Sequence, residues 1–315
     1  MKKIVAVFPG QGSQAIGMGK SFVDRYDYAK ELLSEANDAL GYDFSKLLFE
    51  ENDLLGLTQY TQPSILLVSI IAYKLFESEL PVKPLYALGH SLGELSAVCA
   101  VGGLSLSDAL QVARARGEFM QKACEGANAG MMVTLGLSDE AAETLCESAR
   151  GDGKKVWTAN YNCDGQIVLA GIKADLESLT DRAKALGAKR AMLLDMSVAS
   201  HCPLLSAAQE PLKAILSEKL NADRFIAPVI SNAAAKPYQT KDEAIALLAD
   251  QLVKPVLYKQ SVAAIEAEAD IFVEFGYANV LKGLNKKIVA KETIGVSNAD
   301  DLEAAIEFLS KGEAR

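Results

Sequence analysis

The sequence predicts an α/β protein in which a mostly parallel sheet is covered by helices. Short apolar runs typical of buried strands alternate with longer segments of helical periodicity toward both ends of the chain. Half of the 315 residues are apolar and 23% are charged, so the chain can bury a sizeable core. This length fits one large domain or two modest ones. The predicted strands are Ile4–Phe8, Leu85–Leu88, Val229–Ser231, Ile271–Phe275 and Thr293–Val296.

Helices are predicted between these strands from their apolar periodicity and from start signals. Pro63 stands where a first-turn residue needs no N–H, and Ser105 with Asp108 resembles a capping box. The predicted helices are Tyr26–Leu40, a segment opened by Thr61-Gln62-Pro63, Ser91–Ala100, Ser105 to about Glu125, Leu204–Leu220, Lys241–Val253 and Ser261–Ala269.

The middle of the chain has a different order of elements. Strands are predicted at Met131–Leu137, Val156–Asn160, Gln166–Ala170 and Ala188–Leu194, with helices from Ser138 to Ala149 and over Asp175–Leu186. This β-α-β-β-α-β order is the ferredoxin-like pattern. A segment of about seventy residues can be inserted into a larger domain when its ends lie close together. We therefore predict a large subdomain, residues 1–127 and 198–315, and a small one, residues 128–197.

Composition excludes several classes of function. The five cysteines form no CxxC pair and only two histidines are present, so neither a disulfide framework nor a metal site is expected. A net charge of −9 argues against nucleic acid or an anionic membrane surface as a partner. The longest apolar stretch, Ile65–Tyr73, is too short to span a bilayer, and Ile4–Phe8 is too short for a signal peptide. We expect a cytoplasmic protein.

A candidate nucleophile lies between a predicted strand and a predicted helix. Gly89-His90-Ser91-Leu92-Gly93 is a G-x-S-x-G motif, and at such a junction a sharp turn exposes the serine oxygen. The N–H groups that follow and the helix dipole face any negative charge that grows on a bound carbonyl oxygen. The alternative is a glycine-rich turn with a capping serine, but the strand–helix context favours the nucleophile.

A serine hydroxyl needs a general base, and the chain offers two histidines. His90 stands beside the serine in the turn, where its side chain should point away from that of Ser91, so packing suits it better. His201 lies in a predicted loop between a strand and a helix, as a base held by a scaffold often does. A single loop histidine is more often only solvated, but if Ser91 is the nucleophile, His201 is the better base.

The loop after the first strand, Gly10-Gln11-Gly12-Ser13-Gln14-Ala15, formally satisfies a dinucleotide-binding pattern. That interpretation requires a second strand ending in an acidic residue about twenty positions on. A helix is predicted there instead, with Asp27, Glu31 and Glu35 on its polar face. A loop whose backbone N–H groups contribute half of an oxyanion hole, with Gln11 as the donor, is the better interpretation.

Two arginines fall on opposite faces of the helix that Ser105 begins. Arg114 has Glu118 four residues on, which predicts a surface ion pair. Arg116 shares its face with apolar residues such as Val112 and Met120, so it needs an anionic partner. That partner is either a structural group elsewhere in the fold or the carboxylate of a substrate, bound through two parallel hydrogen bonds. Helix geometry alone slightly favours the structural group.

Taken together, these motifs resemble the malonyl-CoA:acyl-carrier-protein transacylase family of acyltransferases. The resemblance covers nearly the whole chain and keeps the family's order of motifs. They are Phe8-Pro9-Gly10-Gln11-Gly12-Ser13-Gln14, the Gly89–Gly93 turn, Arg116-Gly117, the stretch from Asn160 to Gly171 with Gly165-Gln166, Ser200-His201 and Asp250-Gln251-Leu252.

The resemblance implies a fold, a reaction and a set of roles. The large subdomain would be similar to α/β-hydrolases, the small one ferredoxin-like, and the active site would lie between them. Malonyl-CoA and acyl carrier protein would be the partners, with no cofactor because the coenzyme A thioester is the substrate. The roles it implies are a dyad of Ser91 and His201, a backbone carbonyl at Gln251 that orients the imidazole, oxyanion N–H groups at Gln11 and Leu92, a malonyl carboxylate bound by Arg116, and supporting positions at His90, Asn160 and Asn162.

The sequence departs from the family pattern at one turn. Gly276-Tyr277-Ala278-Asn279 stands where the family usually has Gly-Pro-Gly, which affects the loop shape there.

A serine hydrolase is the competing enzyme, although the α/β-hydrolase triad normally places its histidine near the C-terminus. A non-catalytic carrier-binding subunit is the third possibility. An acidic carrier would need a local basic patch on this acidic chain, and the candidates are Lys189-Arg190 and the group Lys282, Lys286 and Lys287.

Overall fold

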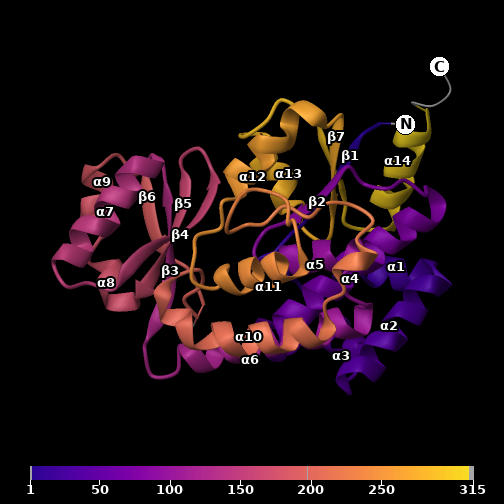
Figure 1. Cartoon of the computed structure of the whole chain (residues 1–315), viewed down its shortest axis with the longest axis horizontal. Coiled ribbons are helices and arrows are strands. Elements are labelled where there is room, and N and C mark those ends of the chain that lie inside the picture. The colour runs from indigo at the N-terminus through magenta and orange to yellow at the C-terminus, as the bar shows by residue number, and fades with distance from the viewer. Residues whose placement is uncertain (1, 197, 312–315) are drawn as a thin grey trace.

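The computed structural model describes residues 2–196 and 198–311, and two sheets organise them (Figure 1). One sheet is parallel, with the strand order β2-β1-β7-β8, and the other is antiparallel, with the order β4-β5-β3-β6. The predicted α/β class with a parallel sheet is therefore confirmed. The parallel strands are β1 (Ile4–Phe8), β2 (Tyr86–Gly89), β7 (Ile271–Phe275) and β8 (Thr293–Val296).

The parallel sheet lies inside the larger part of the molecule. All five residues of the central strands β1 and β7 are buried, as expected for parallel strands covered on both faces. Helix α4 is buried over most of its length and packs against α6, and α10 also packs against α6 (Figure 1). The helices of this part are α1 (Lys20–Arg25), α2 (Asp27–Leu40), α3 (Phe44–Phe49), α4 (Thr58–Glu79), α5 (Leu92–Ala100), α6 (Leu106–Ala123), α10 (Ser206–Lys219), α11 (Lys241–Asp250), α12 (Tyr258–Ile265), α13 (Val280–Asn285) and α14 (Ala299–Ser310).

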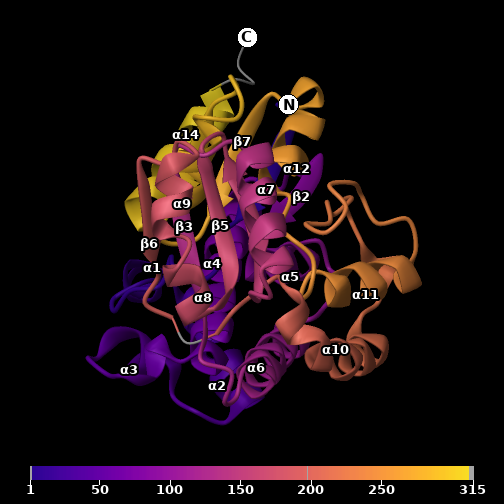
Figure 2. The ribbon, with the colours of Figure 1, turned by 90° about the vertical axis from the view of Figure 1, so that its left-hand side faces the viewer.

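The antiparallel sheet is a separate layer with its own helices. Figure 2 shows this sheet facing the viewer, with α7, α8 and α9 over its outer face. Its outer face forms a small core with these helices, whereas Met131 and Val168 on its inner face join the main core. The elements are β3 (Ala129–Leu135), α7 (Asp139–Gly151), β4 (Val156–Cys163), β5 (Gln166–Ile172), α8 (Lys173–Glu177), α9 (Thr180–Ala185) and β6 (Arg190–Leu193).

Edge strand β4 ties the antiparallel sheet to the rest of the protein. The Tyr161 N–H donates to the Val256 carbonyl at 2.9 Å, and the Val256 N–H donates to the Ala159 carbonyl at 2.8 Å. Lys259 on α12 adds ion pairs to Asp139 at 2.6 Å and to Asp164 at 3.0 Å. The antiparallel sheet is thus connected to the α12 region by backbone pairing as well as by charge.

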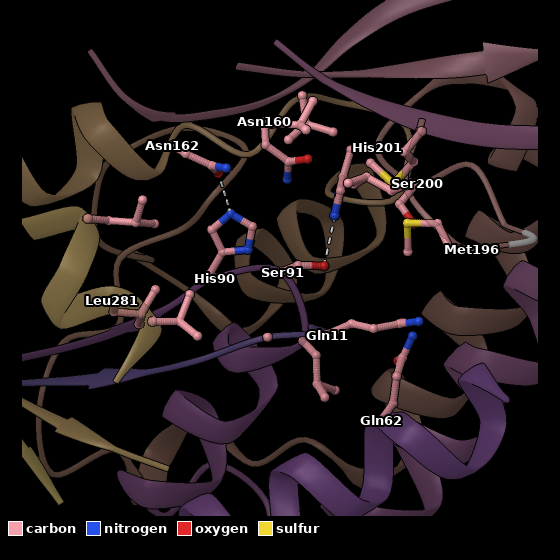
Figure 3. A pocket seen from close by; sticks show the side chains of 18 of the residues that line it. Gln11, Gln62, His90, Ser91, Asn160, Asn162, Met196, Ser200, His201 and Leu281 are labelled. Atoms are coloured by element: carbon pink, nitrogen blue, oxygen red, sulfur yellow. Dashed lines mark hydrogen bonds between the residues drawn. The ribbon is translucent and has the colours of Figure 1, made fainter. Parts of the chain in front are cut away.

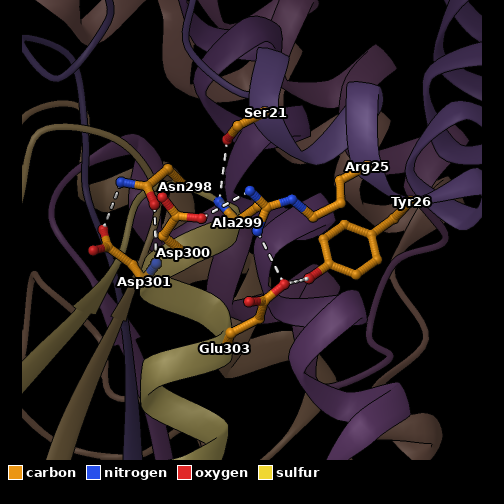
Figure 4. Close-up of polar contacts among 8 residues, drawn as sticks. All are labelled: Ser21, Arg25, Tyr26, Asn298, Ala299, Asp300, Asp301 and Glu303. Carbon is orange, nitrogen blue, oxygen red and sulfur yellow. Dashed lines mark hydrogen bonds and ion pairs between the residues drawn. The ribbon is translucent and has the colours of Figure 1, made fainter.

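The two ends of the described chain meet through α1 and α14. Arg25 pairs with Asp300 at 2.8 Å and with Glu303 at 2.9 Å (Figure 4). Glu303 also accepts a hydrogen bond from the Tyr26 hydroxyl at 3.2 Å. Asn298 caps α14 by accepting from the Asp301 N–H at 2.9 Å. These contacts hold the last helix against the N-terminal segment.

Several predicted elements are corrected. Val229–Ser231 is not a strand of the sheet: Val229 forms an isolated bridge to Ala87 before the chain turns away. The helix containing Pro63 begins at Thr58, because polar residues that carry no apolar pattern continue it backwards. The predicted helix Asp175–Leu186 is broken into α8 and α9, and its break at Leu179 lets that side chain become buried.

Two further helices end or begin elsewhere than predicted. The segment predicted as Lys241–Val253 ends at Asp250, which frees the next carbonyl from the helix. The one predicted at Ser261–Ala269 runs from Tyr258 to Ile265. Only Lys282 of the three candidate docking lysines lies within α13. The sequence patterns also missed α1, α3 and α14, and the predicted subdomain boundary at residue 197 lies outside the described residues.

Candidate active site

The sharpest turn of the site holds Ser91 between β2 and α5. Ser91 has a positive φ of 55°, which non-glycine residues adopt rarely, and such strained positions cluster at active sites. A Cβ on Gly89 would collide with the Gly93 backbone, and one on Gly93 would collide with the Phe8 carbonyl. The two glycines of the motif are therefore required by close backbone packing.

The side chain of Asn232 holds this turn in place. Its Oδ1 accepts from the Ser91 N–H at 2.7 Å, and its Nδ2 donates to the Gly89 carbonyl at 2.7 Å. Asn232 is fully buried. No sequence pattern indicates this residue, since it is distant in the chain and matches no motif.

The structure brings Ser91, His201 and Gln251 together in one line. Ser91 Oγ lies 2.7 Å from His201 Nε2 (Figure 3). His201 Nδ1 lies 2.6 Å from the Gln251 carbonyl oxygen. That carbonyl is available because α11 ends at the residue before it. A carbonyl can only accept, so Nδ1 carries the proton and Nε2 is free to accept one from the serine.

His201 is buried, and its surroundings favour the neutral imidazole. Burial, reinforced by the positive charge of Arg116, lowers the pKa of His201 to about 3, against the opposing hydrogen bond to Gln251. A neutral imidazole is the form that can remove a proton from a hydroxyl group.

Arg116 lies inside the site, and its guanidinium contacts neutral groups. Nη1 donates to Gln62 Oε1 at 2.8 Å, while Nη2 donates to Gln251 Oε1 at 2.8 Å and to Ser91 Oγ at 3.2 Å. Burial lowers the pKa of Arg116 to about 10, and the charge of Glu94 opposes that shift. In contrast, Arg114 forms the predicted surface pair with Glu118 at 2.9 Å, which confirms that prediction.

Gln11 and Leu92 are the two residues predicted to supply oxyanion N–H groups. Gln11 and Leu92 both line the pocket, and Gly10 packs so closely on the His90 carbonyl that a Cβ there would collide with it. Within residues 2–196 and 198–311, the N–H groups of Gln11 and Leu92 donate to no other protein group.

His90, Asn160 and Asn162 also line the cavity. His90 Nε2 lies 2.8 Å from Asn162 Oδ1, and Figure 3 shows its ring turned toward Asn162 and away from the Ser91 hydroxyl. The ring also packs on Tyr258 with centroids 5.6 Å apart. Asn160 is buried at the point where β4 bridges to Val256. This arrangement is the one expected for a packing histidine.

The cavity has a volume of about 360 Å³ and lies between the two sheets. The antiparallel sheet contributes only uncharged side chains: Met131, Val133, Asn160, Asn162, Gln166 and Val168. Helix α13 contributes Val280, Leu281 and Leu284 from the other side. Such a wall suits a long uncharged chain, with the charged groups concentrated at Ser91.

The unusual turn Gly276–Asn279 leads directly into α13. Ala278 and Asn279 both have positive φ, and Asn279 donates to the Ser297 hydroxyl at 2.9 Å. The buried Glu274 carboxylate accepts from the Leu281 N–H at 3.0 Å and the Lys282 N–H at 2.7 Å. The departure from the family pattern therefore lies at the rim of the cavity.

The sequence analysis missed Gln62, Glu94 and Tyr238 as residues of this site. Gln62 contacts Arg116, and Glu94 accepts hydrogen bonds from Gln251 and Tyr238 behind the serine. The available signal was a single carboxylate in the otherwise uncharged segment Leu92–Ala100. Helical periodicity alone does not indicate which distant groups pair with it.

Comparison with known proteins decides the family. The model of the acyl transferase domain matches residues 5–299. The chain belongs to the acyl transferase family. Among the relatives of this chain, the malonyl CoA-acyl carrier protein transacylase of Bacillus subtilis is 39% identical over 99% of this chain and 98% of its own length. That of Escherichia coli strain K12 is 36% identical over 97% and 99%. The resemblance found from the sequence is confirmed.

Solved structures of the acyl transferase family agree in fold. The malonyl-CoA:acyl carrier protein transacylase of Helicobacter pylori has a TM-score of 0.95 and 47% identity, covering 99% of both chains. A malonyl-transacylase in complex with a type II polyketide synthase acyl-carrier protein has a TM-score of 0.93 and 33% identity, covering 97% of this chain and 99% of its own. Among the residues that the structure describes, no helix is long and apolar enough to cross a membrane, and no metal-binding group of acidic, cysteine and histidine side chains occurs.

Proposed function

We propose that this protein transfers a malonyl group from malonyl-CoA to the thiol of acyl carrier protein, through a malonyl ester on Ser91. The observation that carries this proposal is the position of Arg116, whose Nη2 lies 3.2 Å from Ser91 Oγ. A buried guanidinium beside a nucleophile suits an acyl group that bears its own carboxylate. The relatives named as malonyl transacylases support the same substrate and carrier.

In the first half-reaction, Ser91 Oγ attacks the thioester carbonyl while its proton moves to His201 Nε2. Negative charge develops on the carbonyl oxygen, and the N–H groups of Gln11 and Leu92 stabilise it. The C–S bond then breaks, the coenzyme A thiolate leaves, and it takes the proton from His201. The product is malonyl-Ser91 and free coenzyme A, with no cofactor required.

In the second half-reaction the same groups act, but the thiol of the carrier is now the nucleophile and Ser91 Oγ is the leaving group. The carrier's thiol gives its proton to His201, and its sulfur attacks the ester carbonyl of malonyl-Ser91. The Ser91 Oγ–C bond breaks, and Oγ recovers the proton from His201. Throughout, the Gln251 carbonyl keeps the imidazole in the tautomer that can accept at Nε2.

The proposal includes two subdomains of different fold. The strand order β4-β5-β3-β6 supports a ferredoxin-like small subdomain, residues 128–197. The elbow between β2 and α5 supports an α/β-hydrolase-like large subdomain, residues 1–127 and 198–315. The five cysteines are free and buried, which supports a reducing compartment such as the cytoplasm.

Intact-protein mass spectrometry tests the reaction. Mixing with malonyl-CoA should add one malonyl group to the wild type and none to Ser91→Ala. The wild-type adduct should disappear when acyl carrier protein with its thiol is added and persist with water alone, which separates a transferase from a hydrolase. An adduct of normal yield on Ser91→Ala would refute the assignment.

The carrier's docking site is the part of the proposal that charge reversal can test. Lys286 and Lys287 are exposed at the end of α13, whose apolar residues line the cavity, and Lys189 and Arg190 are exposed at the start of β6. Whichever of these two pairs contacts the carrier, reversing its charges should raise the carrier's KM at low salt. Malonyl loading should stay unchanged, since steering charges act on association. The other pair serves as the matched control, and no effect from either would place docking elsewhere.

A further inference from the structure

A buried carboxylate lies directly behind the nucleophile and has no part in the reaction written above. Glu94 follows Ser91 by one helical turn on α5 and is 0% exposed. It is the only charged residue of that helix. A buried charge of this kind is retained only where hydrogen bonds and an opposite charge compensate its burial.

Three donors converge on this carboxylate. Glu94 Oε2 accepts from Gln251 Nε2 at 2.5 Å and from the Asn232 N–H at 3.0 Å, while Oε1 accepts from the Tyr238 hydroxyl. Burial raises the pKa of Glu94 to about 7, and these donors together with the charge of Arg116 oppose the shift. Because every partner donates, the site suits the ionised carboxylate, which offers acceptors only.

The contact with Glu94 fixes which end of the Gln251 amide faces Arg116. Nε2 is directed at Glu94 and at the Ser91 carbonyl, 3.0 Å away, so Oε1 is left to accept from Arg116 Nη2 at 2.8 Å. The opposite orientation would set N–H groups against the guanidinium. The main chain of the same residue accepts from His201 Nδ1 at 2.6 Å. Gln251 therefore joins the base, the cation and the buried carboxylate.

This amide also keeps the two opposite charges apart. Gln251 stands between Glu94 and Arg116, so the acid acts on the guanidinium through its field and not through a direct ion pair. The fork of Arg116 stays bound to two neutral oxygens, from Gln62 and Gln251. Neutral acceptors leave the cation's charge available for another carboxylate, which a direct pair with Glu94 would not.

We propose that Glu94 is a positioning residue for recognition of the acyl carboxylate: it holds the Gln251 amide with Oε1 toward Arg116, and so keeps the charged fork aimed beside Ser91. The inference rests on the proposed malonyl transfer. It predicts that loss of the Glu94 charge weakens selection for a carboxylate more than it weakens the chemistry at Ser91.

The test compares malonyl-CoA with acetyl-CoA as donors to Ser91 in single-turnover loading. In Glu94→Gln, the new side chain has one acceptor oxygen in place of two, and its N–H₂ group must face one of the three donors. The Gln251 amide should therefore turn its oxygen toward that N–H₂ group and away from Arg116. A hydrogen bond to a charged group corresponds to about tenfold or more. We expect the ratio of malonyl to acetyl loading to fall about tenfold, mainly through a higher KM for malonyl-CoA, with acetyl loading changed less than about threefold.

A second variant makes the test independent of how well the first one folds. Gln251→Met removes the side-chain amide and keeps the main-chain carbonyl that His201 needs. It should lower the ratio to a similar extent, and Glu94→Gln added to it should lower the ratio no further, because both act through one contact. If Glu94→Gln unfolds, an unchanged ratio in Gln251→Met overturns the inference.

Glu274 provides the matched control. It is also 0% exposed, burial likewise raises its pKa to about 7, and it contacts α13 instead of Gln251. Glu274→Gln should change the melting temperature but leave the malonyl-to-acetyl ratio as in the wild type. An equal drop in the ratio for Glu274→Gln, or equal losses with both donors in a folded Glu94→Gln, overturns the positioning role. Failure of the wild type to load Ser91 would instead refute the proposed function.

Discussion

The parts of the molecule built on the parallel and the antiparallel sheet contribute very differently to the cavity. Ser91, Arg116, His201 and Gln251 all come from the part that contains the parallel sheet. The antiparallel sheet presents only apolar and amide side chains to the same space. The difference teaches that reactivity and enclosure are divided: one part holds the charges, and the other supplies a wall that lowers their contact with water.

The location of the reactive groups follows from strand direction. The chain leaves β1 toward Gln11, β2 toward Ser91 and β7 toward the Gly276–Asn279 turn. Because parallel strands end at the same edge, these three connections meet there, which is where open α/β sheets bind ligands. An antiparallel sheet divides its turns between two edges, so it gathers fewer loops at one place.

The largest contrast should come from His201→Ala. Without the base, loading of Ser91 from malonyl-CoA should slow by about 10³-fold or more, since general-base activation is lost. Stopped-flow or quenched single-turnover loading would measure it. A loss of less than tenfold would show that another group activates the serine.

The same histidine predicts an unusual pH profile. Its pKa is lowered to about 3, so the imidazole stays neutral and able to accept a proton as the pH falls through the range where an exposed histidine becomes charged. With acetyl-CoA, which carries no carboxylate to engage Arg116, the loading rate should stay level from about pH 7 to pH 5. A decline with a midpoint near 6.5 would contradict the buried, neutral base.

Arg116 should give the next largest effect. Arg116→Ala should lower malonyl loading by about a hundredfold while acetyl loading is kept, because the charge-assisted bonds to the acyl carboxylate are lost. Arg116→Lys should recover only part of it, since an ammonium lacks the planar fork. Equal losses with both donors would mean that Arg116 is structural.

A substitution in the cavity wall formed by the antiparallel sheet should reduce malonyl loading less. Asn162→Ala removes the partner of the His90 ring, which lies 2.8 Å away, and leaves every charged group in place. We expect a three- to tenfold rise in the KM for malonyl-CoA, about the value of one neutral hydrogen bond, with kcat nearly unchanged. A loss of malonyl loading as large as that of Arg116→Ala would show that the wall contributes directly to reactivity and does not only enclose the site.

The smallest effect should come from the ion pairs that join the two parts. Lys259→Met removes partly exposed pairs to Asp139 and Asp164, and should lower the free energy of unfolding by about 1 kcal/mol or less. The backbone pairing of β4 with Val256 remains, so loading should change less than about twofold. Urea unfolding with parallel activity assays would measure both. A large loss of activity would mean that these charges set the width of the cavity.

Local sequence was sufficient for the elements whose conformation it encodes directly. Ile4–Phe8, Ile271–Phe275 and Thr293–Val296 match their predicted bounds, because a short apolar run between breakers suits a buried parallel strand. The elbow around Ser91 and the cap at Ser105 were also predicted from patterns a few residues long. These features are recognisable from the order of neighbouring residues, although distant groups such as Asn232 and the Phe8 carbonyl hold the elbow in place.

Only the tertiary structure decided how distant polar groups pair. Periodicity identified Arg116 as a charge on an apolar face, but its partner Gln251 lies 135 residues away, and Glu94 lies 157 residues from Gln251. The sequence likewise predicted a strand at Val229–Ser231, where the chain forms only isolated bridges and then turns to bring Asn232 to the elbow. A buried polar group must find partners wherever packing brings them, so its environment is a property of the whole fold and not of its own segment.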